Sequence, residues 1–428
     1  MYIVNGTIYT MDANNTVIEK GAIRIKDGIL AEVGREANRR DTECIKAEGD
    51  MPQQNKAGHG NENIRTGQYC QVMVNPEQHE EVIDAQGGWI LPGLVEVHCH
   101  IGIQEEKKGM EGNDCNETVN PVTPWLRAID AINPMDAAFK EAVRAGITCV
   151  QAGPGSANVV GGQFVIMKTY GRCVDDMIVK APSAMKIAFG ENPKVNYSGQ
   201  NQSPVTRMAI AGLLRRELFE AKAYCENRKK ALERGETLGE EFVMDFTKEC
   251  WVPVFEGEIP LKAHVHRVDD IFTAIRIAGE FGLDMTLDHC SEGHLVAEEL
   301  ALAGYPAIVG PDFTSRNKIE VQNAAFKTVG ILYEAGVQVA ITTDHPVSLI
   351  QSLPLCAGLA VKAGLPFEAG LRAITIEGAR IAGVADRVGS LEIGKDADIS
   401  IFTTNPMEIM SETLYTIIDG KVVYRKGV

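Results

Sequence analysis

Apolar and polar positions change their periodicity twice along the chain. Residues 2–34 form short alternating runs around the turn signals Asn5-Gly6 and Asp27-Gly28, which predicts strands joined in hairpins. From residue 84 onward, apolar runs of strand length alternate with amphipathic helical stretches. After residue 386, short alternating runs return around Asp419-Gly420. We therefore expect β elements at both ends of the chain and an α/β unit between them.

The strand-length runs of the central unit are apolar and several end in polar residues: "WILPGLVEVHCH", "GITCVQAGP", "AMKIAFGE", "LKAHVHR", "DMTLDHC", "YPAIVGPDF" and "VQVAITTDHP". Strands that alternate with helices predict a parallel sheet, and this number of units favours a (β/α)8 TIM-like barrel. The eighth strand is less obvious, and "GGQFVIMKTYG" at residues 161–171 is a candidate. An open doubly wound sheet is the alternative. It is less favoured because the sequence has no Gly-x-Gly-x-x-Gly fingerprint after its first strand.

This pattern predicts a composite β domain, a small β-sandwich, of residues 1–90 and 387–428, because chain termini often lie close together. Residues 91–386 then form the barrel, with a helical insertion near residues 200–258. The insertion would cover the barrel mouth, make a subunit contact, or decorate the surface.

Residues 35–82 are polar and without a periodic pattern, which predicts a flexible surface excursion. His59 and His79 fall in this segment, and solvated loop histidines are the default interpretation for both.

Composition and charge limit the classes of molecule that the protein is expected to bind. The 428 residues are 45% hydrophobic and 23% charged, which is ordinary for a soluble globular protein. A formal charge of −16 argues against nucleic acid and anionic membranes as partners, although it says little about the substrate. We expect a small-molecule substrate and assembly into a homo-oligomer. Ten cysteines without a Cys-x-x-Cys pair favour reduced thiols and a cytoplasmic location. No signal peptide is expected at the N-terminus, nor an apolar run approaching the roughly 20 residues of a membrane span.

The run Trp89–Val97 ends in His98, Cys99 and His100. A strand places residues i and i+2 on the same face, so both imidazoles point the same way and Cys99 faces away. One metal ion accepts two such nitrogens, although a pair of hydrogen-bonded core histidines is the competing interpretation.

The other strand ends decide between these interpretations. Polar side chains that a barrel would gather at the carboxyl rim of its strands are His98, His100, Lys186, His264, His266, His289 and Asp344. Taken singly, Lys186 would be a strand lysine that reaches solvent, His289 a satisfied core histidine and Asp344 a helix cap. Core packing does not readily place all of them at strand ends, so we expect an active site there.

This order of residues resembles the amidohydrolase superfamily over nearly the whole chain. The segments that carry the resemblance are "ILPGLVEVHCH", the tail "VGSLEIGKDADISIF" with "IIDGKVVYRKG", and the opening "VNGTIYTMD" with "GAIRIKDGILAEVG". The "AHVH" stretch is more similar to the imidazolonepropionase- and dipeptidase-like branch than to base deaminases, which carry a Glu where His266 and Arg267 stand.

The resemblance implies one divalent metal on His98, His100 and Asp344. It implies a second on His264 and His289. Lys186, carboxylated by CO₂, would bridge the two ions, with Glu191 as the alternative bridging ligand. Zn²⁺ is the expected ion, in one or two copies, with Mn²⁺ or Fe²⁺ as substitutes.

These roles predict a metal-dependent hydrolase that cleaves an amide or cyclic amide C–N bond of a small molecule, dipeptidase-like in its substrates. A metal pair activates water and polarises a carbonyl oxygen, and Asp344 would accept the water's proton and pass it to a leaving amine. His266 would contact the carbonyl or the substrate, although His264 and His266 are exchangeable in these roles. Two alternatives stay open: a mononuclear imidazolonepropionase-like hydrolase or deaminase acting on a ring, and a non-catalytic scaffold. His345 and His294 are neighbours of the site in sequence.

Overall fold

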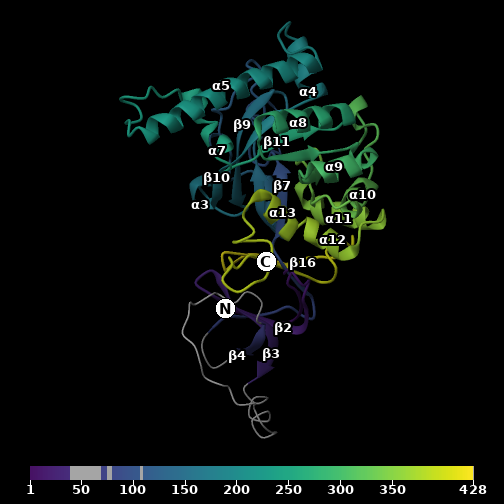
Figure 1. The fold of residues 1–428 in the computed structure, drawn as a ribbon. Coiled ribbons are helices and arrows are strands. Elements are labelled where there is room, and N and C mark those ends of the chain that lie inside the picture. Colours follow the sequence, from purple (N-terminus) through teal and green to yellow (C-terminus); the bar gives the residue numbers. More distant parts are fainter. Residues whose placement is uncertain (39–68, 75–79, 107–108, 428) are drawn as a thin grey trace.

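The computed structural model describes residues 1–38, 69–74, 80–106 and 109–427, and it contains two large sheets (Figure 1). The first is nine-stranded in the order β17-β16-β15-β6-β1-β2-β3-β4, with β5 beside β1. Its strands come from both ends of the chain: β1 (Tyr2–Tyr9), β2 (Val17–Lys26), β3 (Ile29–Asn38), β4 (Cys70–Val74), β5 (Val82–Asp84), β6 (Trp89–Pro92), β15 (Ile399–Phe402), β16 (Thr413–Ile418) and β17 (Lys421–Arg425).

The second sheet is eight-stranded and runs in sequence order from β7 to β14. Its strands are β7 (Leu94–Cys99), β8 (Ile147–Ala152), β9 (Val160–Lys168), β10 (Ile178–Ala188), β11 (Leu261–Val265), β12 (Met285–His289), β13 (Ala307–Val309) and β14 (Val339–Ile341). Its two edges meet, because Thr342 Oγ1 donates to the His98 carbonyl at 2.6 Å and the His100 amide donates to the His345 carbonyl at 2.8 Å. The predicted barrel beside a second β unit is therefore confirmed, while the residues chosen as domain boundaries stay a prediction.

One strand departs from the (β/α)8 pattern. The candidate eighth strand is present as β9, but it runs antiparallel to both β8 and β10. A parallel neighbour needs a crossover of a dozen or more residues. Residues 153–159, between β8 and β9, are too few for one, so the chain turns back as a hairpin.

Helices surround the barrel. The α-helices are α2 (Ala137–Arg144), α3 (Val174–Met177), α4 (Glu191–Ser198), α5 (Arg207–Glu233), α6 (Phe246–Glu249), α7 (Val252–Phe255), α8 (Val268–Phe281), α9 (Ala297–Ala303), α10 (Lys327–Glu334), α11 (Leu353–Lys362), α12 (Phe367–Ala373) and α13 (Ile376–Ala382). Short 3-10 turns are η1 (Ala128–Asp130), η2 (Gly293–Leu295), η3 (Ile319–Val321) and η4 (Ile350–Ser352). Within the described residues, no helix has both the length and the apolar character that a bilayer span requires.

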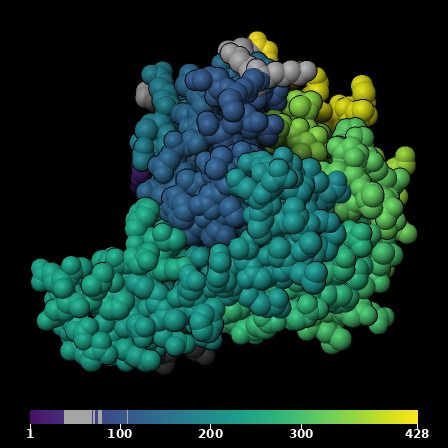
Figure 2. All heavy atoms as spheres, turned by 90° about the horizontal axis from the view of Figure 1, so that it is seen from above, coloured from purple at the N-terminus to yellow at the C-terminus, as the bar shows by residue number. Residues whose placement is uncertain are grey.

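The predicted insertion contains α5. Thr206 caps this helix by accepting the Ala209 amide at 3.0 Å, which satisfies one of the free N–H groups of its first turn. Ile210, Leu214 and Leu218 recur every fourth residue and are buried, and α5 contacts α8. Figure 2 shows the teal and green segment that contains α5 as a projection from the body of the molecule.

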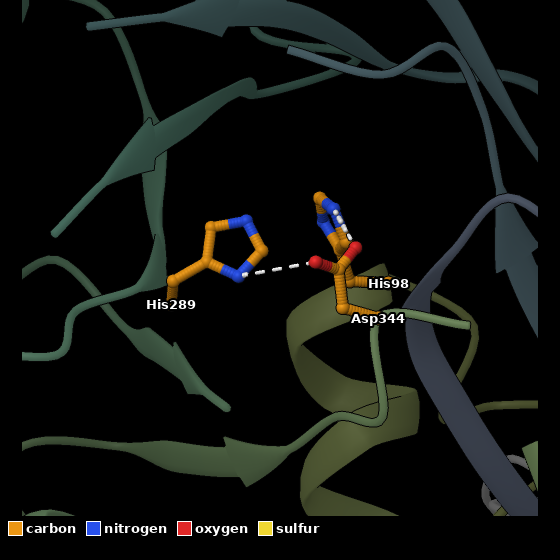
Figure 3. Close-up of side chains that lie close together, drawn as sticks. All are labelled: His98, His289 and Asp344. Carbon is orange, nitrogen blue, oxygen red and sulfur yellow. Dashed lines mark ion pairs between the residues drawn. The ribbon is translucent and has the colours of Figure 1, made fainter. Parts of the chain in front are cut away.

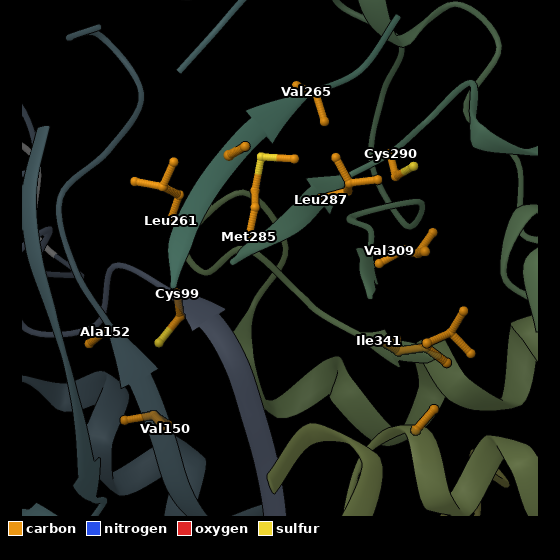
Figure 4. Close-up of a cluster of buried hydrophobic side chains, with 14 of the residues drawn as sticks. Cys99, Val150, Ala152, Leu261, Val265, Met285, Leu287, Cys290, Val309 and Ile341 are labelled. Atoms are coloured by element: carbon orange, nitrogen blue, oxygen red, sulfur yellow. The ribbon is translucent and has the colours of Figure 1, made fainter. Parts of the chain in front are cut away.

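Successive side chains of the barrel strands point alternately to the apolar cluster and to the opposite side of the sheet. Leu261, Ala263 and Val265 of β11 belong to the apolar cluster drawn in part in Figure 4, whereas the intervening Lys262 and His264 face the opposite side. Cys99 lies in the same cluster, away from its neighbouring histidines, as the alternation predicts. The strands are buried on both faces, which explains their nearly continuous apolar runs.

A buried ion network joins the two sheets and explains the Gly-Lys-Asp-Ala-Asp tail. Lys168 of β9 lies 2.9 Å from Asp396, 2.8 Å from Asp398 and 3.2 Å from Asp419. Asp419 belongs to the predicted hairpin turn between β16 and β17. Burial of an ammonium requires paired carboxylates, so this tail fastens the β sheet of the termini to the barrel.

The predicted surface excursion of residues 35–82 is corrected at both ends, and residues 39–68 and 75–79 lie outside the described residues. Residues up to Asn38 extend β3, and β4 pairs with β3 in parallel, so backbone pairing orders both ends of the segment. His59 and His79 lie outside the described residues.

Candidate metal centre

The barrel gathers the predicted polar residues at the carboxyl ends of its strands. The side chains brought together are His98, His100, Lys186, His264, His266, His289 and Asp344, and none is more than 9% exposed. His98, Lys186, His264 and His289 belong to β7, β10, β11 and β12, and Asp344 follows β14. The parity of each strand turns its side chain inward, as the sequence pattern predicts.

A first group consists of His98, His289 and Asp344, whose ligand atoms all lie within 4.8 Å of one another (Figure 3). Asp344 Oδ1 lies 3.5 Å from His98 Nε2 and 3.1 Å from His100 Nε2, and it is buried without a hydrogen bond of acceptable geometry. Bonds of about 2.0–2.2 Å at tetrahedral angles place neighbouring ligand atoms roughly 3.3–3.5 Å apart. The donor set and its spacing therefore fit a divalent cation.

A second group consists of His264, His266 and Glu320, again with ligand atoms within 4.8 Å of one another. Glu320 lies in η3, in the loop after β13, and is 1% exposed. The sequence pattern does not single out Glu320, because its polar loop has no periodicity, and its position after the seventh barrel strand is the one signal it carries. His266 was expected to contact the substrate, but it belongs to the same group of ligand atoms as His264.

Hydrogen bonds fix most of the imidazole rings with Nε2 free. Nδ1 of His100 donates to the Gly153 carbonyl and Nδ1 of His289 to the Gly310 carbonyl, each at 2.7 Å. A carbonyl only accepts, so Nδ1 carries a proton in both rings, and Nε2 is the nitrogen that offers a lone pair when the ring is neutral. Such partners orient metal-binding histidines.

Three buried charged groups that the sequence analysis missed support His98. Its Nδ1 donates to Asp288 Oδ2 at 2.7 Å, and Lys262 Nζ lies 3.3 Å from the same oxygen. Glu96 accepts the His98 amide at 3.1 Å and also binds Thr343 beside Asp344. Glu96 lies two residues before His98, and Lys262 lies two residues before His264. This spacing places each pair on one face of its strand, and it was the signal available in the sequence.

Burial sets the protonation of the cluster. It lowers the pKa of His98, His264 and His289 well below the usual value, and that of His266 to about 4, which leaves neutral imidazoles. His100 differs: burial lowers its pKa, but Cys115 and Asp344 outweigh burial and raise it to about 10. A metal ion would therefore displace a proton from His100.

Lys186 is fully buried, with Nζ 3.4 Å from His98 Nε2. Burial lowers its pKa to about 8. Glu191, the alternative bridging ligand, begins α4, and its backbone amide donates to Glu320 Oε2 at 2.8 Å. Its side chain belongs to neither ligand group among the described residues.

Two site residues adopt left-handed backbone conformations that are uncommon outside glycine: φ is 72° at His289 and 50° at Asp344. The neighbouring histidines are placed differently. His345 Nδ1 accepts the Ile350 amide at 3.2 Å, and His294 pairs with Thr328 at 3.0 Å, so neither points its bonded nitrogen at the cluster.

A cavity of about 610 Å³ lies in the loop after β13, lined by residues that include Asp312, Phe313, Arg316 and Phe326. It begins directly after Gly310, whose carbonyl holds His289. Ser348, four residues after Asp344, donates to the Phe313 carbonyl and so joins the cavity wall to the loop of the first ligand group.

Comparisons with known proteins identify the family. A family model described as the amidohydrolase family matches residues 276–424. The crystal structure of an amidohydrolase from Thermotoga maritima MSB8 is 33% identical, with a TM-score of 0.84, and the match covers 99% of this chain and 100% of that one. The chain belongs to the amidohydrolase family.

This amidohydrolase also has curated relatives. Amidohydrolase tasK of Hapsidospora irregularis is 29% identical over an alignment of 362 residues, and the match covers 79% of this chain but only 37% of that protein's length. An imidazolonepropionase from Rhizobium rhizogenes is 26% identical over 381 residues, covering 82% of this chain and 87% of the relative. The comparisons agree with the predicted family and with the predicted reaction class, metal-dependent hydrolysis of carbon–nitrogen bonds in small molecules.

Proposed function

We propose that this amidohydrolase cleaves an amide or cyclic amide C–N bond of a small molecule with a divalent metal held by His98, His100, His289 and Asp344. The observation that carries the proposal is the convergence of one carboxylate oxygen with two imidazole Nε2 atoms at 3.1–3.5 Å. Zn²⁺ suits this mixture of nitrogen and oxygen donors, and Mn²⁺ or Fe²⁺ are the substitutes to test.

A divalent cation bound here would bring the pKa of a water molecule toward neutrality and polarise a carbonyl. Asp344 is placed to hold and move the proton. Its pKa is lowered: burial raises it, but His289 and His100 outweigh burial. The carboxylate is then ionised at neutral pH, accepts the proton from water, and returns it to the leaving amine.

Lys186 is proposed as the bridging ligand in carboxylated form. An ammonium 3.4 Å from His98 Nε2 would compete with a cation for that lone pair, whereas a carbamate offers two anionic oxygens. Its full burial and its position between the ligand strands favour it over Glu191. If Glu191→Ala loses a metal while Lys186→Ala keeps its full complement, the assignment is wrong.

The cavity in the loop after β13 is proposed to receive the body of the substrate. Phe313 and Phe326 supply apolar surface, while Asp312 and Arg316 supply opposite charges for polar substituents. The imidazolonepropionase relative supports a cyclic amide as substrate, since its name specifies an imidazolone ring.

The decisive experiment measures hydrolysis of N-acyl amino acids, dipeptides, cyclic ureas and imidazolones. Metal-reconstituted enzyme should turn over at least one class, chelator-treated enzyme none, and added Zn²⁺ or Mn²⁺ should restore the rate. His98→Ala should not be restored, while His294→Ala, whose ring pairs with Thr328, should behave as wild type. Full activity in a sample shown to be free of metal would refute the proposal.

A further inference from the structure

A second cavity, of about 440 Å³, lies along α2. Its walls come from α2 and the loop before it, from the turn after β9 and from β17 of the nine-stranded sheet. None of the described residues in these walls belongs to either group of ligand atoms at the carboxyl ends of the barrel strands. Because β9 runs antiparallel to its neighbours, the turn after it lies at the opposite end of the barrel from the metal centre. The cavity is therefore distinct from the metal centre.

Three cations and, in the described part of the chain, no carboxylate line this cavity. Lys140 and Arg144 lie about one turn apart on α2, and Arg172 follows β9. Arg144 shares its charge with Glu141 at 2.7 Å, whereas Lys140 and Arg172 have no described carboxylate within ion-pair distance. The whole chain has 58 acidic and 42 basic residues, so a cavity lined by cations alone is opposite in charge to the molecule. Its local field favours an anion.

Apolar and aromatic side chains form the remaining walls. Phe139 and Val143 contribute from α2, Met135 from the loop before it, and Tyr170 and Tyr424 from the other two elements. Tyr170 is 58% exposed and Met135 is 65% exposed, so the cavity opens to solvent. Its volume falls in the range of about 300–1,000 Å³ that is typical of small-molecule sites. An inorganic anion alone would leave most of these apolar walls uncovered, whereas an aromatic ring would stack on them.

The apolar wall is connected to the loop that follows a metal ligand. Phe139 is buried and packs against Gly102, two residues after His100, where an added Cβ would lie 2.9 Å from Phe139 Cε2. Gly102 has a φ of 72°, a conformation that glycine adopts without strain. Its carbonyl accepts the Asn133 amide at 2.9 Å, and Asn133 directly precedes Pro134 of the cavity wall. A ligand that displaces Phe139 would therefore move the backbone beside His100.

We propose that this cavity is an effector site for a small organic anion with an aromatic body, and that its occupancy changes the metal affinity at His100. The anionic group, a carboxylate or a phosphate, would lie between Lys140 and Arg172. The aromatic body would lie against Phe139 and Tyr170. The inference goes beyond the proposed function, because binding at this cavity involves none of the groups that perform hydrolysis.

Isothermal titration calorimetry on the full-length protein tests the site, both as purified and after chelation of metal. 2-Naphthoate and 2-naphthylphosphonate carry the two anionic groups on one aromatic body. 2-Naphthamide keeps the body without the charge, and inorganic phosphate keeps a charge without the body. We expect both aromatic anions to bind about tenfold more tightly than either control compound, and the tighter of the two identifies the preferred anionic group.

Variants locate the binding. Lys140→Gln with Arg172→Gln should weaken 2-naphthoate binding about tenfold, and both residues are exposed, so the fold should be retained. Tyr170→Ala should weaken the anion and the amide alike, because it removes aromatic surface and no charge. Lys362→Gln is the matched control: Lys362 is an exposed lysine at the end of α11 that does not line the cavity, and its variant should bind as wild type does.

Zinc affinity, measured with a competing chelator, tests the link to His100. Saturating 2-naphthoate should change it about fivefold or more in wild type, and not in the double variant. Equal binding of 2-naphthoate and 2-naphthamide, or wild-type affinity in the folded double variant, would overturn the site. Unchanged zinc affinity at saturation would overturn the link. Neither result bears on metal-dependent hydrolysis, which is tested by metal removal and by His98→Ala.

Discussion

Asp288 offers a way to weaken the metal site without touching a ligand. In Asp288→Asn, the amide oxygen still accepts a hydrogen bond from His98 Nδ1. The change removes the negative charge of the carboxylate, which lies 2.7 Å from Nδ1 and makes Nε2 a more basic metal ligand. Loss of such a partner costs about 10–100-fold in metal affinity, or about 1.4–2.7 kcal/mol. A fluorescent chelator competing for Zn²⁺ at 25 °C measures this affinity on folded protein.

The same change removes the partner of a buried ammonium. Lys262 Nζ lies 3.3 Å from Asp288 and is 1% exposed, so leaving it unpaired should cost about 3–5 kcal/mol of folding free energy. Adding Lys262→Met to Asp288→Asn should recover most of this stability but not the metal affinity. Thermal unfolding of the metal-free variants measures the stability part separately.

Asp398→Asn is the matched control. Asp398 is a buried carboxylate paired with a lysine at 2.8 Å, but it lies at the junction of the two sheets. It should lower stability and leave metal affinity unchanged. If folded Asp288→Asn binds Zn²⁺ within twofold of wild type, the orienting role of Asp288 is refuted.

Further predictions concern the base, the cavity and the junction. Asp344→Asn should lower turnover about 10²–10⁴-fold with little change in melting temperature, and unchanged steady-state turnover would remove it from the mechanism. Burial raises the pKa of Asp312 to about 6, so its contribution to stability is present below its unfolded pKa near 3.8 and is lost as pH rises through 6. Denaturant unfolding should therefore show that Asp312→Asn gains about 1.4 kcal/mol relative to wild type between pH 5 and pH 8, whereas a parallel pH response of the two proteins would contradict this. Lys168→Met leaves three carboxylates without their ammonium partner. It should therefore lower the melting temperature more than substitution of any single one of these carboxylates.

Much of the candidate centre could be predicted from the sequence, because strand parity is local. His98 and His100 share a face with Glu96, and His264 and His266 share one with Lys262, wherever the strands are placed. Likewise, alternation of apolar strands with amphipathic helices is written into consecutive residues. The hairpin signals and the long helix at residues 207–233 follow from the same local patterns.

The tertiary structure decided the contacts between segments that are far apart. The direction of β9 depends on which neighbours it pairs with, and its apolar run is compatible with either direction. Asp288 meets His98 across 190 positions of the chain, and the adjacent residue His289 faces the metal cluster instead. Glu320 joins His264 and His266 from a loop whose sequence has no period. Barrel closure fixes these distances, because only it determines which strand ends and which loops share one rim.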